Sequence, residues 1–148
     1  MRVTVETGIS IGDLVEALRP HGLTLQNFAS IREQQLGGFV QAGCHGTGAF
    51  VPPVDEQVVA MTIVTPGMGT LRLSAEEDPE LFYLARVGMG LLGVVTEVTL
   101  QCVPRHQLIE HTYVLSQKDI HMGHEKRISE HKHIRYMWIP YTVMTIPL

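Results

Sequence analysis

One segment of this chain combines residue types and spacing that suit chemistry, the glycine-rich run over residues 27–49. Its five glycines and three alanines leave the backbone open, so several N–H groups can converge on one anionic group. Ser30 and Thr47 add hydroxyl donors of small size. These features predict a cradle for a flat cofactor that carries phosphate.

This segment matches neither of the common phosphate-binding motifs. No Lys-Ser or Lys-Thr pair follows the glycines, as a P-loop requires, and no G-x-G-x-x-G follows a predicted strand. A tight glycine turn that only lets strands pack closely explains the glycines about equally well. The glycines alone therefore leave both interpretations open.

Other residues with chemical potential form weaker patterns. His121 and His124 are one helical turn apart and could share a face, but no third ligand recurs at a fixed spacing, so we predict no metal site. His45 has no partner acid, which argues against a catalytic base. Asp55 and Glu56 are adjacent and should point apart, so they should not form an acid–base pair.

The elements that must position the glycine-rich segment alternate in type. Ser10 begins a capping box and Asp78 precedes a proline, so each predicts the start of a helix. Residues 66–69 have turn composition and predict a β-hairpin. Strands are expected at residues 2–6, 58–65, 70–73 and 94–100. The pattern predicts an α+β domain with mostly antiparallel strand pairs.

The charges divide the chain near Pro104. Residues 1–103 carry five basic and eleven acidic residues, whereas residues 104–148 carry six basic and four acidic ones. This change predicts a domain boundary. In the second stretch, strands are expected at residues 107–115, 133–138 and 142–146, and a helix at residues 117–131.

Composition excludes several classes of protein. The formal net charge of −4 disfavours nucleic acid as a partner. No window approaches the roughly 20 apolar residues that a membrane span needs. Cys44 and Cys102 are too few for a disulfide scaffold. We expect Cys44 to be a packed, inert thiol.

A family resemblance extends over nearly the whole chain. Residues 22–49, 52–58 and 92–100 resemble the flavin-binding domain of the sugar-1,4-lactone oxidoreductases, which are FAD enzymes of the vanillyl-alcohol-oxidase or PCMH type. The Gly-x-His-Gly-Thr-Gly core and residues 27–35 are most similar to the plant-type dehydrogenases of that family. The resemblance implies an α+β fold, with the second part of a PCMH-type FAD-binding domain at residues 1–103 and the start of an α+β cap domain at residues 104–148.

The resemblance also implies which residues contact FAD. In this family, the loop ending in His-Gly-Thr-Gly lies along the cofactor. The matching positions are Ser30, Gln35, Gly38, Ala42, Gly43, Cys44, His45, Gly46, Thr47, Gly48 and Val94. Ser30 would also lie near the substrate. Ala29 matches the small residue that hinders oxygen from reaching the reduced flavin, and alanine there favours a dehydrogenase.

The activity that the resemblance implies is FAD-dependent oxidation of L-galactono-1,4-lactone to L-ascorbate, with hydride transfer to flavin N5. Cytochrome c is the implied electron acceptor. The implied location is the mitochondrion, with peripheral association with the inner membrane. An oxygen-using oxidase of gulono- or arabinono-lactone is the nearest alternative. A non-catalytic remnant or interaction module is an alternative of another class.

Two parts of the family pattern fall outside this sequence. The phosphate loop of the first FAD subdomain should precede Arg2, and the Glu and Arg pair that holds the lactone should follow Leu148. We therefore expect a fragment without catalytic residues of its own, which is inactive alone.

Overall fold

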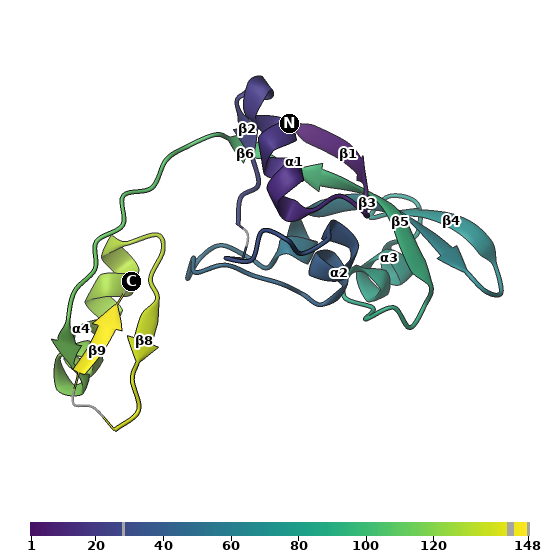
Figure 1. Ribbon diagram of the computed structural model, residues 1–148. Helices are drawn as coiled ribbons and strands as arrows, with labels where there is room; N and C mark the ends of the chain where they lie inside the picture. The colour runs from purple at the N-terminus through teal and green to yellow at the C-terminus, as the bar shows by residue number, and fades with distance from the viewer. Residues whose placement is uncertain (28, 142–143, 148) are drawn as a thin grey trace. The chain divides into compact units, whose positions relative to one another are not determined.

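The computed structural model describes residues 1–27, 29–141 and 144–147 and divides the chain into two compact units (Figure 1). The first unit comprises Met1–Gly46 and Pro52–His106. The second comprises Thr47–Val51 and Gln107–Leu148. The glycine-rich run thus contributes to both units.

A four-stranded antiparallel sheet forms the centre of the first unit. Its strands are β1 (Arg2–Glu6), β3 (Val58–Thr65), β4 (Gly69–Ser74) and β5 (Val94–Gln101). They lie in the order β1-β5-β3-β4. The last of these strands in the sequence, β5, therefore lies between β1 and β3. All four strands and the β3–β4 hairpin confirm the sequence prediction. Short strands β2 (Leu23–Thr24) and β6 (Val103–Pro104) form a separate pair.

Three helices accompany this sheet: α1 (Ile11–Leu18), α2 (Leu36–Gln41) and α3 (Pro79–Arg86). The Ser10 hydroxyl accepts the Asp13 N–H at 3.0 Å, and the Asp78 carboxylate accepts the Leu81 N–H at 3.2 Å. Both capping predictions are therefore confirmed. Helix α2 was not expected, because two of its six residues are glycines, which disfavour helices. Two short 3-10 turns, η1 (Arg19–His21) and η2 (Val54–Gln57), complete the unit.

The helices bury their apolar residues against one face of the sheet. Phe39 of α2 and Phe82 of α3 are among the largest fully buried side chains, and they belong to one core cluster with Val98 of β5. Burying a side chain of this size contributes about 2 kcal/mol. The opposite face of the sheet is polar, as is common for an antiparallel sheet that meets water. The helical face therefore carries the core of the unit.

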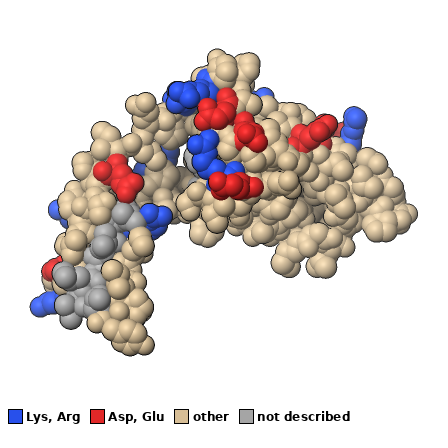
Figure 2. Space-filling model, in the orientation of Figure 1, with Lys and Arg blue, Asp and Glu red and all other residues tan. Residues whose placement is uncertain are grey.

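Charged side chains of both signs lie next to one another on the first unit (Figure 2). Glu16 of α1 pairs with Arg32 at 3.1 Å and with Arg19 at 3.3 Å. Hydrogen bonds from Arg32 and then from Arg19 lower the pKa of Glu16. Because all three side chains are exposed, these pairs add little stability.

The second unit contains a three-stranded antiparallel sheet and one long helix. The strands β7 (Leu115–Ser116), β8 (Tyr136–Trp138) and β9 (Met144–Pro147) lie in the order β7-β9-β8. Helix α4 (Gln117–Glu130) follows β7 and is capped by the Ser116 hydroxyl, which accepts the Asp119 N–H at 3.2 Å. In the described ranges of the chain, no helix is long and apolar enough to cross a membrane.

Strand predictions in the second unit were less successful. The strand expected at residues 107–115 is wrong except for Leu115, because residues 107–114 are exposed and pair with no strand. The strand expected at residues 133–138 shortens to Tyr136–Trp138. Of the strand expected at residues 142–146, Thr142 and Val143 lie outside the described residues, and the remainder belongs to β9.

Gly93 fixes the approach of β5 to β3. Its φ of 147° lies in a region that L-residues rarely adopt, and a Cβ there would collide with the backbone carbonyl of Val64. The strand pair begins at this point, since Val94 is the register partner of Val64. Only glycine satisfies both demands.

We therefore predict that Gly93→Ala lowers the free energy of unfolding by about 3 kcal/mol, because backbone strain adds to a clash with main-chain atoms. Urea denaturation of the chain provides the measurement. Gly67→Ala in the β3–β4 turn is the matched control, since a Cβ at Gly67 meets nothing within 4 Å. Equal midpoints for the two variants would contradict the role assigned to Gly93.

Candidate cofactor site

The glycine-rich segment is clamped to the turn between β1 and α1 by backbone hydrogen bonds. Gly12 and Ile11 donate to the carbonyls of Arg32 and Gln34, each at 2.9 Å. In the other direction, Leu36 donates to Ile9 and Gly37 to Thr7, each at 2.9 Å. A Cβ on Gly37 would lie 3.2 Å from the Thr7 Cβ, which is closer than most Cβ contacts. Gly37 therefore allows the two backbones to approach.

The chain leaves α2 through a left-handed turn at Gly43, with φ of 63°. The Cys44 N–H donates to the Phe39 carbonyl at 3.1 Å, and the Cys44 carbonyl accepts the Val54 N–H at 2.9 Å. Gln34 Nε2 lies 3.8 Å from the Cys44 sulfur. Both the backbone and the side chain of Cys44 are thus held by the first unit.

Beyond Cys44, the backbone presents donor groups to its surroundings. Within the described residues, the amides of His45 and Gly46 donate to no other group. The His45 side chain is exposed, and its Nδ1 lies 3.0 Å from the Gly46 carbonyl. Gly38, one turn of α2 earlier, is also exposed, and a Cβ there would meet nothing within 4 Å. An anionic or acceptor-rich ligand fits such a surface.

Buried amide groups near the same segment have unused hydrogen-bonding capacity. Asn27 is 4% exposed and Gln57 is 3% exposed, yet Asn27 Nδ2 and Gln57 Nε2 have no partner in the described part of the chain. The same holds for Gln34 Oε1. Buried polar groups are normally satisfied, so these atoms indicate a place where further acceptors and donors belong.

Two of the expected FAD contacts, Thr47 and Gly48, belong to the second unit. The Thr47 carbonyl accepts the Ile134 N–H at 3.1 Å, and its hydroxyl lies 3.2 Å from His133 Nδ1. Gly48 forms an antiparallel bridge with His133. The Thr47 hydroxyl is thus engaged by a side chain of its own unit, whereas the loop over residues 42–46 is held by the first unit.

The remaining expected residues lie around α2 or at the start of β5. Gln35 is the residue before α2, and the Ala42 N–H donates to the Gly38 carbonyl at 3.0 Å. Ser30 is exposed, while Ala29 packs partly against the core cluster. Val94 is 68% exposed. In the part of the chain that the structure describes, no hydrogen bond joins Ser30 or Val94 to the loop.

Sequence reasoning missed two interactions beside this loop. Asp55, buried in η2, pairs with Arg86 of α3 at 3.6 Å, while its neighbour Glu56 is exposed. The side chain of Gln41 bonds to backbone groups of Ala85, Arg86 and Gly90. Both interactions join residues more than 30 positions apart, so no local pattern could have indicated them.

His124 makes a contact within the second unit. His124 Nδ1 lies 3.1 Å from the Tyr136 hydroxyl, which joins α4 to β8. In the described ranges, no group of three His, Cys, Asp or Glu side chains could hold a metal ion.

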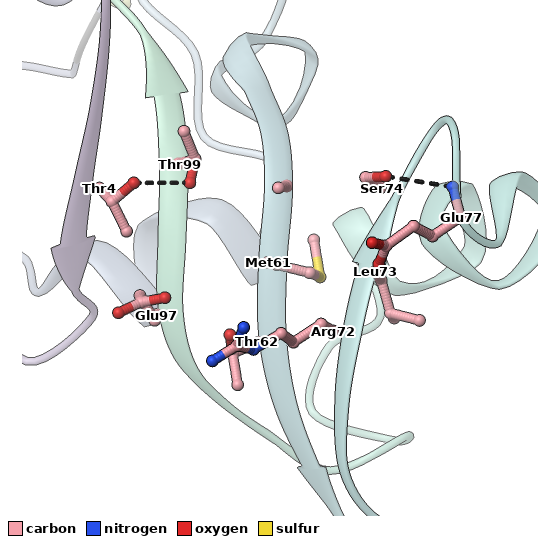
Figure 3. Close-up of a pocket in the computed structure, with 10 residues that line it drawn as sticks. Thr4, Met61, Thr62, Arg72, Leu73, Ser74, Glu77, Glu97 and Thr99 are labelled. Atoms are coloured by element: carbon pink, nitrogen blue, oxygen red, sulfur yellow. Dashed lines mark hydrogen bonds between the residues drawn. The ribbon is translucent and has the colours of Figure 1, made fainter.

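A hollow of about 350 Å³ lies on the polar face of the sheet (Figure 3). Thr62 of β3 has Arg72 of β4 and Glu97 of β5 as its register partners, and the hydroxyls of Thr4 and Thr99 are 2.8 Å apart. None of the residues that line this hollow is an expected cofactor contact. Thr4 and Thr99 bond to each other, and the Ser74 hydroxyl accepts the Glu77 N–H at 3.2 Å.

The first unit therefore has the features of a cofactor-binding domain, in which a sheet and three helices support a loop with free amides. Residues 1–74 match the family described as an FAD binding domain. The chain belongs to this family, and its cofactor is FAD. The open amides, the space at Gly38 and the unsatisfied buried amides are compatible with a ligand that carries a diphosphate and a polar ring system.

Curated relatives are similar along almost the entire chain. The chain is 66% identical over 140 residues to L-galactono-1,4-lactone dehydrogenase 1, mitochondrial, of Oryza sativa subsp. japonica, which covers 95% of this chain and 24% of the relative. It is 62% identical to the corresponding Arabidopsis thaliana protein, covering 95% of this chain and 23% of the relative. Identity to L-gulonolactone oxidase of Bos taurus is 36%, covering 95% of this chain and 32% of that protein. The chain spans about a quarter of the length of the plant relatives.

A solved structure has the same fold. A cholesterol oxidase variant from Brevibacterium sterolicum superposes with a TM-score of 0.82 at 20% sequence identity, covering 99% of this chain and 31% of that chain. Together with the family match over residues 1–74, this likeness confirms the α+β, PCMH-type fold that the family resemblance implied.

The two cysteines should differ in reactivity. Cys102 is 3% exposed, and burial raises the pKa of its thiol. Cys44 is half-buried within the loop over residues 42–46, so it is less enclosed than the packed, inert thiol expected from the sequence. We predict that iodoacetamide labels Cys44 in the native chain and Cys102 only after unfolding, with rates at least about tenfold apart. Mass spectrometry of tryptic peptides measures both. Equal labelling of the two thiols in native conditions would contradict the packing described here.

Proposed function

We propose that this chain forms one wall of the FAD site of an aldonolactone dehydrogenase, which oxidises L-galactono-1,4-lactone to L-ascorbate. The observation that carries the proposal is the loop over residues 42–46, where the amides of His45 and Gly46 have no partner among the described residues, in a chain that belongs to an FAD-binding family. The residues of this loop are those that the family resemblance assigns to the cofactor. FAD, when bound, supplies the hydride acceptor.

Each expected residue has a role in this proposal. The amides of His45 and Gly46 donate to acceptor atoms of the cofactor, and Gly38 and Ala42 leave room for it beside α2. Val94 and Ser30 contribute exposed groups from β5 and from the loop before α2. Gln35, Gly43 and Cys44 complete the proposed set in the first unit. Thr47 and Gly48 belong to the second unit, so their assignment to FAD rests on the family resemblance alone.

Two features favour a dehydrogenase over an oxidase. Identity to the rice dehydrogenase is 66%, against 36% to the bovine L-gulonolactone oxidase. Ala29 occupies the position where, in the family, a small side chain shields the reduced flavin from oxygen. Its partial packing against the core fits a fixed shield. Lactone oxidation without matched peroxide formation is the expected behaviour of the whole enzyme.

The same relatives support a cellular location for the proposed enzyme. The rice and Arabidopsis dehydrogenases are named as mitochondrial, which supports a mitochondrial location for this chain. Cytochrome c as the electron acceptor and peripheral association with the inner membrane belong to the proposal by family resemblance alone. We further propose that residues 1–103 are part of the FAD-binding domain and that residues 104–148 begin the cap domain.

A test of this site uses the open space beside Gly38. A leucine side chain there would project into the volume assigned to FAD, while helix α2 would gain from the loss of a glycine. We predict that Gly38→Leu weakens FAD binding at least about tenfold relative to the native chain, without lowering the free energy of unfolding. Fluorescence titration with FAD gives the dissociation constant.

Gly67→Leu is the control for this test, because Gly67 is also an open glycine but lies in the β3–β4 turn. Its FAD affinity should match that of the native chain. Native-like affinity of Gly38→Leu would place the cofactor elsewhere. Failure of the native chain to bind FAD would favour a non-catalytic remnant or interaction module.

A further inference from the structure

Gln41, the last residue of α2, bonds to two different backbone segments. Its Nε2 donates to the Ala85 carbonyl at 2.7 Å and lies 3.4 Å from the Arg86 carbonyl. Its Oε1 accepts the Gly90 N–H at 3.2 Å. One half-buried amide therefore caps the end of α3 and holds the glycine turn that follows it.

The turn that Gln41 holds has an unusual backbone. Met89 has φ of 49° and Gly90 has φ of 75°, so two consecutive residues are left-handed. For Met89 this conformation is unfavourable and needs support from its surroundings. The support again comes from Gln41, whose carbonyl accepts the Met89 N–H at 3.3 Å. Gly88 also lies close to the Gln41 side chain, because a Cβ on Gly88 would be 3.2 Å from Gln41 Oε1.

These contacts place two separate segments relative to each other. Gln41 directly precedes the open loop over residues 42–46, and the turn at Gly90 leads within four residues to Val94. A further contact lies beside them, because a Cβ on Gly43 would sit 3.3 Å from Val87 Cγ1. Gln41 thus joins both segments by hydrogen bonds from its side chain and from its backbone carbonyl.

We propose that Gln41 is a positioning residue of the FAD site, which fixes the turn before Val94 against the loop over residues 42–46. This inference rests on the proposed function, because both segments are assigned to FAD there. Gln41 itself does not touch the cofactor in this account. It holds the loop over residues 42–46 and the turn before Val94 at a fixed distance from each other, so that FAD binds a preformed surface.

Replacement of the amide by a side chain of similar size tests this role. Gln41→Met removes the bonds to Ala85 and Gly90 but keeps the length of the side chain. We expect FAD binding to weaken about tenfold, since two hydrogen bonds that shape the site are lost. Hydrogen–deuterium exchange should accelerate in residues 87–94, while the strands β1, β3 and β4 stay protected.

Gln101→Met is the matched control. Gln101 Nε2 also bonds to two carbonyls, those of Met1 and Cys102, each at 3.1 Å, and its side chain is likewise half-buried. Its loss should leave FAD affinity within about twofold of the native value. Gln41→Glu serves as a second variant, because a carboxylate still accepts the Gly90 N–H but no longer donates to Ala85. Its affinity should fall between those of the native chain and Gln41→Met.

The outcomes separate this inference from the proposed function. An affinity order of native chain, Gln41→Glu, Gln41→Met, with Gln101→Met near native, supports the positioning role. Native-like affinity in both Gln41 variants overturns it and leaves the FAD site intact. An equal loss in Gln101→Met also overturns it, since the effect would then follow general stability. Absence of FAD binding by the native chain overturns the proposed function, and the positioning role with it.

Discussion

The structure of the first unit depends on the backbone clamp between residues 7–12 and residues 32–37. Four hydrogen bonds of 2.9 Å join the turn after β1 to the segment before and within α2. The clamp requires Gly37, whose missing side chain lets α2 lie against Thr7. Because α2 carries Phe39 into the core, the clamp and the core fix the same helix from two sides.

The open loop follows from this arrangement. Residues 42–46 leave a helix that is held by the clamp, and Cys44 is bonded on both sides, so the amides of His45 and Gly46 are free at a defined place. A rigid frame with unsatisfied donors binds a ligand without first ordering a loop, which favours affinity. Gln41 extends this frame to the turn before β5, and Gly93 fixes where that strand begins.

The sequence was sufficient for the elements with local signals. Ser10 and Asp78 mark helix starts through their own side chains, and the β3–β4 hairpin has a turn composition that specifies it. Helix α2 could not be predicted, because its two glycines disfavour a helix and no local pattern reveals the close contact of Gly37 with Thr7. The strand expected at residues 107–115 contains apolar and β-branched residues, but residues 107–114 pair with no strand. In the site, the glycine loop was recognisable from composition and family resemblance, whereas the roles of Gln41 and Asp55 depend on contacts with residues distant in sequence.

In the proposed site, FAD lies against the loop over residues 42–46 and the start of β5. Nuclear magnetic resonance of the ¹⁵N-labelled chain during titration with FAD tests it most directly, because each backbone amide reports its own surroundings. The amides of His45 and Gly46 should shift most, together with those of Gly38 and Val94. Shifts confined to the polar sheet face around Arg72 and Glu97, or no shifts at all, would contradict it.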